Sequence, residues 1–143
     1  MKTKGVARVV IAVRDIEKAR KFYSELFGIS FWDAGIHKDS GTRAMVSWDG
    51  GIELVSPISP APANSTGEGI ARLLQDREAA LFGVAFKVSD IEEARARAKE
   101  KGFRITSEID RFLPPGFKVF REIFLDPKDT HGISVILIQS ERA

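Results

Sequence analysis

The alternation of apolar and other residues along the chain occurs in two copies. Over residues 8–13 and again over 83–88, every second residue is apolar, which is the spacing of a β-strand with one buried face. Each stretch runs into the motif Val-x-Asp-Ile-Glu-x-Ala-Arg, at 13–20 and 88–95, and the two segments are identical at six of eight positions. This repeat, with an offset of 75 residues, predicts two copies of one structural unit.

A helix is predicted after each of these strands. Asp15 and Asp90 stand where an N-cap carboxylate accepts hydrogen bonds from free backbone N–H groups, and Glu93 adds a box-like second contact. Gly28 and Gly102 follow as left-handed C-terminal stops. The apolar stripe of the first helix, which we expect to pack in the core, is Ile16, Ala19, Phe22, Tyr23 and Leu26.

Three further strands are predicted in each copy. They cover residues 29–33, 43–48 and 51–56 in the first copy, and 103–110, 118–125 and 133–139 in the second. A connector rich in Pro and Ala, 57–64, and a short helix over 68–80 join the copies.

The fold class follows from this order of elements. A four-stranded sheet with one helix leaves its second face uncovered, so we expect an α+β fold of two tandem βαβββ modules. Their mixed sheets are expected to pair around a shared cleft. The chain is then a single domain, 1–143, with module one at about 5–57, a linker at about 58–80 and module two at about 82–140.

Composition excludes several classes of protein. With 22 Lys and Arg against 20 Asp and Glu, the net charge is only +2, so no basic field favours nucleic acid. Zero cysteines exclude a disulfide scaffold, a zinc ribbon, an iron–sulfur cluster and a thiol nucleophile. The N-terminus does not read as a signal peptide, and no apolar run is long enough for a membrane span. We therefore expect a soluble, cytoplasmic protein with no membrane partner.

The paired motifs resemble those of the vicinal oxygen chelate superfamily, which includes glyoxalase I, bleomycin-resistance proteins, extradiol dioxygenases and methylmalonyl-CoA epimerase. The resemblance covers about residues 6–139. Gly-Ile-Ala-Arg-Leu-Leu at 69–74 and Leu-Asp-Pro-Lys-Asp-Thr-His-Gly at 125–132 look most like the methylmalonyl-CoA epimerase branch. The resemblance implies a fold that hosts many chemistries, so it does not select one activity.

The resemblance also implies four metal-ligand positions, one on the first and one on the last strand of each module. They fall on Arg8, Glu53, Gly83 and Ile136. Only Glu53 is a possible ligand, because a guanidinium stays protonated and the other two side chains offer no donor atom. A metal on one carboxylate would be held mainly by water. We therefore expect no cofactor, with a divalent metal only as the minority alternative.

Arg8 and Glu53 are the candidate site residues. The first and last strands of a module are neighbours in this fold, so the two side chains are expected within ion-pair reach on the concave face of the first sheet. Residues 9, 11 and 13 face the helix, so Arg8 must point the other way. The pair is either a plain ion pair that replaces a metal or a ligand site. In a ligand site, Arg8 binds a carboxylate, phosphate or enolate oxygen, and Glu53 orients the ligand or acts as a catalytic base.

The remaining candidates carry weaker signals. His131 lies in a predicted turn and His37 in a predicted loop over 35–41, where polar surface residues are common. Some aromatic residues could wall a pocket, although most are expected in the core: Phe31, Trp32, Trp48, Phe82, Phe112, Phe117 and Phe120.

Three functions stay open at this point. The first is a metal-free protein that binds a small organic ligand, with anions among the candidates, as the bleomycin-resistance branch does. The second is a lyase, isomerase, epimerase or dioxygenase with an unconventional metal site, and the third is metal-free proton transfer by Glu53 with Arg8. The missing metal ligands favour the first. We also expect a homodimer, because each sheet has an unpaired surface and the family completes clefts across subunits.

Overall fold

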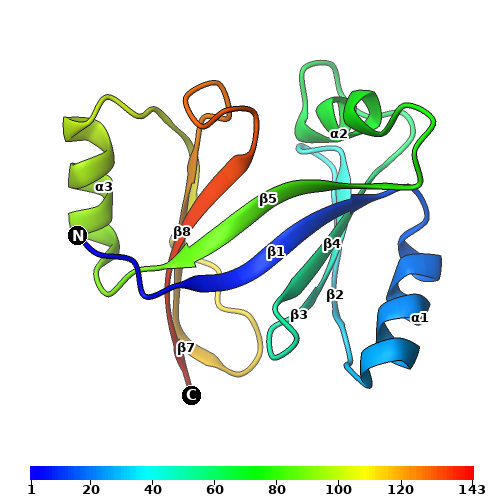
Figure 1. The fold of residues 1–143 in the computed structure, drawn as a ribbon, viewed down its shortest axis with the longest axis horizontal. Helices are drawn as coiled ribbons and strands as arrows, with labels where there is room; N and C mark the ends of the chain where they lie inside the picture. Colours follow the sequence, from blue (N-terminus) through cyan, green and yellow to red (C-terminus); the bar gives the residue numbers. More distant parts are fainter. The chain divides into compact units, whose positions relative to one another are not determined.

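Each copy of the repeat folds into four strands with a helix on one face (Figure 1). The computed structural model describes residues 1–143 and separates into two units. The N-terminal unit is residues 8–82, and the C-terminal unit is residues 83–143 together with residues 1–7. The α+β class and the βαβββ order of both modules are confirmed. The single domain and the cleft shared by the two sheets stay predictions.

The N-terminal unit has the strand order β2-β3-β4-β1. β1 and β4 are parallel, and the other neighbouring strands are antiparallel. The elements are β1 (Val6–Val13), α1 (Ile16–Phe27), β2 (Trp32–His37), β3 (Thr42–Ser47), β4 (Ile52–Pro57) and α2 (Thr66–Leu74). Two predictions were wrong here. β2 covers residues 32–37 instead of 29–33, and α2 ends at Leu74 instead of residue 80, with Gln75 as its C-cap at a φ of 47°.

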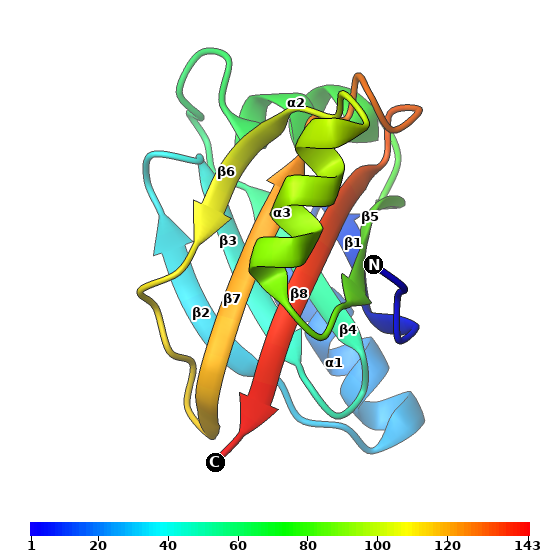
Figure 2. The same ribbon diagram turned by 90° about the vertical axis from the view of Figure 1, so that its left-hand side faces the viewer.

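The C-terminal unit repeats this arrangement with the strand order β5-β8-β7-β6. Its elements are β5 (Ala79–Lys87), α3 (Ile91–Glu100), β6 (Ile105–Ile109), β7 (Phe117–Leu125) and β8 (Ser134–Arg142). β5 and β8 are parallel, and α3 lies over β7 and β8 (Figure 2). None of the three helices is both long and apolar enough to span a membrane.

The helix ends follow the capping residues of the sequence. Asp15 Oδ1 accepts from the Lys18 N–H at 3.1 Å, and Gly28 closes α1 with a φ of 66°. Asp90 Oδ1 accepts from two backbone N–H groups at the start of α3. The Glu93 carboxylate, however, forms an ion pair with the amino terminus of Met1 at 3.1 Å rather than the expected second capping contact.

The buried face of α1 is narrower than its sequence predicts. Tyr23 and Ala19 pack on a core of Val13, Ile16, Met45 and Leu54. Phe22 and Leu26, which were expected in that core, are 55% and 60% exposed. Consecutive helical residues are rotated by about 100°, so a helix that turns Tyr23 toward the sheet turns Phe22 to its flank. There the ring of Phe22 meets the ring of Tyr23 edge to face, at a centroid distance of 5.0 Å.

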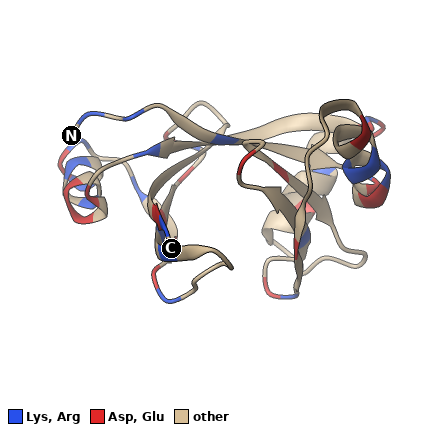
Figure 3. Cartoon of the chain, turned by 90° about the horizontal axis from the view of Figure 1, so that it is seen from below, with Lys and Arg blue, Asp and Glu red and all other residues tan.

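The charged residues of α3 are interleaved rather than segregated (Figure 3, beside the N label). Arg95 pairs with Glu92 at 3.2 Å, and Arg97 approaches Glu100 at 4.0 Å. Arg121 of β7 also reaches Glu92. The helix therefore presents no surface of a single sign, in keeping with the small net charge of the chain.

A bidentate ion pair between Arg104 and Asp129 holds the segment 125–132 in place. Arg104 Nε and Nη2 donate to the two carboxylate oxygens of Asp129 at 3.1 and 2.8 Å, and the Arg104 backbone N–H donates to Oδ2 at 2.9 Å. These hydrogen bonds attach the loop before β8 to the start of β6. The guanidinium of Arg104 lowers the pKa of Asp129 to about 2.

Replacement of Arg104 by Met is expected to raise the pKa of Asp129 toward its ordinary 3.8. In the unaltered protein the folded-state pKa lies below the unfolded-state value. The ion pair therefore contributes to stability above about pH 4, and the contribution is lost as the pH falls through about 2. Urea unfolding should show Arg104→Met less stable than the unaltered protein at pH 7 and equal to it near pH 2. Lys128→Met, in the same loop, serves as the control and should show no such pH-dependent difference.

Candidate functional site

Arg8 of β1 and Glu53 of β4 form an ion pair inside the N-terminal unit. Arg8 Nε donates to Glu53 Oε1 at 2.8 Å, and the two side chains are only 5% and 18% exposed. The parallel pairing of the strands sets Val10 opposite Glu53, so the position two residues earlier on β1 is within reach of that carboxylate. The ion pair expected from the sequence is confirmed.

The two faces of the sheet also divide as expected. Ile11 and Val13 of β1 pack in the core beneath α1, and so do Ile52 and Leu54, which flank Glu53 on β4. Because side chains alternate along a strand, the ion pair lies on the face of the sheet opposite α1.

Two tryptophans flank this pair. The guanidinium carbon of Arg8 lies 5.5 Å from the centroid of the Trp48 ring, within the range of a cation–π contact. Trp32 stacks on Trp48 with a centroid distance of 6.3 Å and an interplanar angle of 29°. Both indole rings are partly exposed. Trp48 therefore lies beside the ion pair, with Trp32 stacked on it.

Among the other aromatic candidates, Phe82 is a partly exposed residue of β5. Phe31 packs against the core beneath α1. Phe117 and Phe120 are buried and meet edge to face in the C-terminal unit at 5.4 Å, whereas Phe112 is half exposed.

One carboxylate oxygen of the pair has no partner. Glu53 Oε1 accepts from Arg8, and Oε2 makes no hydrogen bond within residues 1–143. The site therefore offers a guanidinium, an open acceptor oxygen and an indole surface, a set that can bind a polar organic molecule by hydrogen bonding and stacking.

The sequence matches the model of the glyoxalase/bleomycin resistance protein/dioxygenase superfamily over residues 7–119. The chain belongs to this superfamily. It is 30% identical over 132 residues to the mitochondrial methylmalonyl-CoA epimerase of Bos taurus, and the match covers 92% of this chain and 72% of the relative. It is 31% identical over 135 residues to the human enzyme, with the same shares covered.

Solved structures show the same fold. Methylmalonyl-CoA epimerase from Mycobacterium tuberculosis superposes with a TM-score of 0.71 at 27% identity, covering 95% of this chain and 87% of the other. A Streptomyces coelicolor methylmalonyl-CoA epimerase in complex with 2-nitronate-propionyl-CoA gives a TM-score of 0.69 at 22% identity, with coverage of 96% and 97%. At that identity, the second likeness describes the fold alone.

The structure shows the surroundings of the four positions that the resemblance implies for metal ligands. The guanidinium of Arg8 is engaged with Glu53, and Ile136 is a buried apolar side chain. At Gly83 a Cβ atom would lie 2.5 Å from the carbonyl oxygen of Ser134, so this position has no room for a ligating side chain. No three His, Asp or Glu side chains come together as a metal site within residues 1–143.

The two histidines lie in or next to turns of the chain. His37 is the last residue of β2 rather than part of a loop, which corrects the sequence-based expectation. Its Nδ1 lies 3.0 Å from the hydroxyl of Ser40 in the β2–β3 turn. His131 adopts a left-handed φ of 62° in the turn before β8, so the turn predicted there is present.

A buried acid that the sequence analysis missed lies in the C-terminal unit. Glu122 of β7 is 2% exposed and lies opposite Ile138 in the antiparallel register of β7 and β8. Its neighbour Ile123 belongs to the core under α3, so Glu122 faces the opposite side of the sheet. Phe120 and Phe124 share that face by parity. The signal in the sequence is a charged residue between two phenylalanines on one strand face.

We expect the Arg8–Glu53 pair to be strongly coupled. Arg8→Met leaves a mostly buried carboxylate without this donor, and Glu53→Gln removes the charge that balances the arginine. Each change should lower the free energy of unfolding by about 3 kcal/mol. The double variant should lose less than the sum of the two.

Urea unfolding of the four proteins measures this coupling, with the exposed pair Lys21 and Glu25, 3.9 Å apart, as the matched control. The same cycle at Lys21→Met and Glu25→Gln should give less than about 0.5 kcal/mol. Additive losses at Arg8 and Glu53 would contradict the coupling.

Proposed function

We propose that this chain binds a small organic ligand on the sheet face that carries Arg8 and Glu53, without a resident divalent metal. The observation that supports this most directly is the mostly buried ion pair at positions where the superfamily's enzymes hold a metal. A guanidinium cannot ligate a cation, but it is a strong donor to an oxyanion. The ligand we propose therefore carries a carboxylate or a comparable oxygen acceptor.

Each group in the site would contribute a different interaction. The positive charge of the Arg8 guanidinium would attract the ligand's oxyanion, and Glu53 Oε2 would accept from a hydroxyl or amine. The exposed edges of Trp32 and Trp48 would cover an apolar part of the ligand. A site of this kind binds and orients a molecule without any chemical step.

A second function, epimerisation, is favoured by the relatives of about 30% identity, both of which are methylmalonyl-CoA epimerases. An epimerase removes a proton from a carbon next to a carbonyl group and returns it on the other face. In this chain Glu53 Oε2 would accept that proton while the C–H electron pair moves to the carbonyl oxygen, which Arg8 would stabilise as an enolate. A water molecule on the opposite face would then protonate the carbon and restore the carbonyl, and Glu53 would return its proton to the resulting hydroxide.

Methylmalonyl-CoA distinguishes the two functions. We expect it to quench the fluorescence of Trp32 and Trp48 saturably, and we expect Arg8→Met and Glu53→Gln to weaken binding by about tenfold or more, since each loses a charge-assisted hydrogen bond. Arg20→Met, at a partly exposed arginine on α1 that pairs with Glu17, is the matched control. If quenching is equal in all four proteins, the ligand site lies elsewhere.

Proton exchange then tests for catalysis. In heavy water, an epimerase would exchange the hydrogen at the branched carbon of methylmalonyl-CoA for deuterium faster than the buffer does. Glu53→Gln would abolish that excess. Saturable binding with no excess exchange supports the binding protein, whereas Glu53-dependent exchange supports the epimerase.

Metal content tests the metal-free part of the proposal. Purified protein, dialysed and subjected to elemental analysis, is expected to carry well under one equivalent of zinc, nickel, iron or manganese, because only one of the four inherited positions can ligate. A stoichiometric metal that survives dialysis and disappears in Glu53→Gln would contradict the proposal.

The assembly that we propose is a homodimer. β2 and β6 each have a single strand neighbour, and an unpaired strand edge is a surface on which a second chain can add. Light scattering at micromolar concentration should give a mass of twice 15.8 kDa. A monomer that still binds ligand would refute the dimer but not the binding function.

A further inference from the structure

Two lysines are fixed next to each other in the C-terminal unit. The Lys4 N–H donates to the carbonyl of Lys87 at 2.8 Å, and the Lys87 N–H donates to the carbonyl of Gly5, also at 2.8 Å. The hydroxyl of Thr3 donates to the same Lys87 carbonyl at 3.1 Å. Because these bonds are made by main-chain atoms of both lysines, they hold the two positions adjacent whatever the side chains do.

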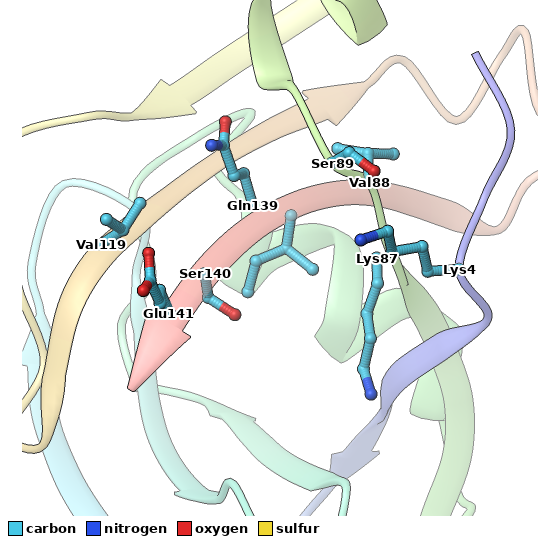
Figure 4. Close-up of a pocket in the computed structure, with 9 residues that line it drawn as sticks. Lys4, Lys87, Val88, Ser89, Val119, Gln139, Ser140 and Glu141 are labelled. Carbon is cyan, nitrogen blue, oxygen red and sulfur yellow. The ribbon is translucent and has the colours of Figure 1, made fainter. Parts of the chain in front are cut away.

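The two ammonium groups are not neutralised by the protein. Within residues 1–143, neither Lys4 nor Lys87 has an ion pair or a side-chain hydrogen bond. The nearby carboxylates are already engaged. Glu141 pairs with Lys118 at 2.7 Å, and the carboxylate of Asp90 caps α3. The Lys87 side chain runs away from Val88 and Ser89, so its ammonium group and that of Lys4 lie at different places around the same opening, and each would attract an anion (Figure 4).

The lysines border a cavity of about 210 Å³, just beyond the end of β5 and beside β8 (Figure 4). At about 30 Å³ per water molecule, that volume corresponds to about seven waters. In Figure 4 the side chain of Lys4 extends toward Val88 and Ser89. The other polar groups in the lining are the hydroxyls of Ser89 and Ser140, the amide of Gln139 and the carboxylate of Glu141, which is paired with Lys118.

We infer that this cavity binds a phosphate group between Lys4 and Lys87. A phosphate monoester carries about −1.5 to −2 charges at neutral pH, which matches two ammonium groups, whereas a carboxylate carries only one. Lysine binds phosphate as a point charge, and hydroxyl groups donate to its remaining oxygens. The site uses no residue of the Arg8–Glu53 pair, so the inference goes beyond the proposed ligand site and stands or falls separately from it.

Isothermal titration with inorganic phosphate, at fixed ionic strength, tests the site. The unaltered protein should bind phosphate saturably. Lys4→Met and Lys87→Met should each weaken binding by about tenfold, since each removes one charge-assisted contact. Lys101→Met, an exposed lysine at the end of α3, should leave binding unchanged. Because the hydrogen bonds at positions 4 and 87 are made by the main chain, both test variants are expected to fold, and circular dichroism checks this.

Two further ligands define what the site recognises. Acetate at the same ionic strength should bind at least tenfold more weakly than phosphate. Adenosine diphosphate presents phosphate on an organic carrier, so tighter binding than inorganic phosphate, still dependent on Lys4, assigns the site to a phosphorylated organic ligand. Equal affinity assigns it to free phosphate, and both results support a phosphate site.

Three results would overturn the inference. They are the absence of saturable phosphate binding, equal affinity for acetate, and affinity that Lys4→Met and Lys87→Met leave unchanged. Backbone amide shifts in nuclear magnetic resonance spectra should also move at Ser89 and Ser140 on addition of phosphate. Shifts confined to residues outside the cavity would place the ion elsewhere and contradict the site.

Discussion

The parallel pairing of the first and last strands of each repeat is the constraint from which the candidate site follows. β1 and β4 are far apart in sequence, and the helix and two strands between them return the chain so that the two run side by side. Their register, Val10 opposite Glu53, leaves Arg8 on the same face and within reach of the carboxylate. A shift of one residue would turn Glu53 into the core beneath α1, so the ion pair and the core specify the same register.

Because both side chains are mostly buried, breaking this ion pair would leave an uncompensated charge and would destabilise the fold. Arginine keeps its proton in proteins, so a guanidinium that is 5% exposed requires an acceptor, and Glu53 supplies one. Only one oxygen of that carboxylate is used, which leaves Oε2 able to meet a ligand without breaking the pair. The neighbouring indole of Trp48 lies against the guanidinium and limits its freedom of movement. The arrangement is suited to recognising an oxygen-rich molecule in a defined orientation.

The sequence predicted those features that depend on local chemistry or on parity. The caps at Asp15 and Asp90 and the outward direction of Arg8 follow from rules that act within one element or between paired strands. Sequence-based predictions were wrong, or missed a residue, where tertiary packing determines whether a side chain is buried. The exposure of Phe22 depends on how α1 is rotated against the sheet, and the burial of Glu122 depends on which face of β7 is covered. Neither is encoded in the spacing of apolar residues alone.

The two repeats share one fold but differ in where their buried charged groups lie. In the N-terminal unit, the mostly buried ion pair is on the paired first and last strands. In the C-terminal unit, the equivalent positions are Gly83 and Ile136, and the buried acid Glu122 stands on β7 instead. The change at Gly83 is structural as well as chemical, because the main chain of Ser134 occupies the space that a Cβ would need. A side chain at position 83 would therefore require β5 and β8 to move apart.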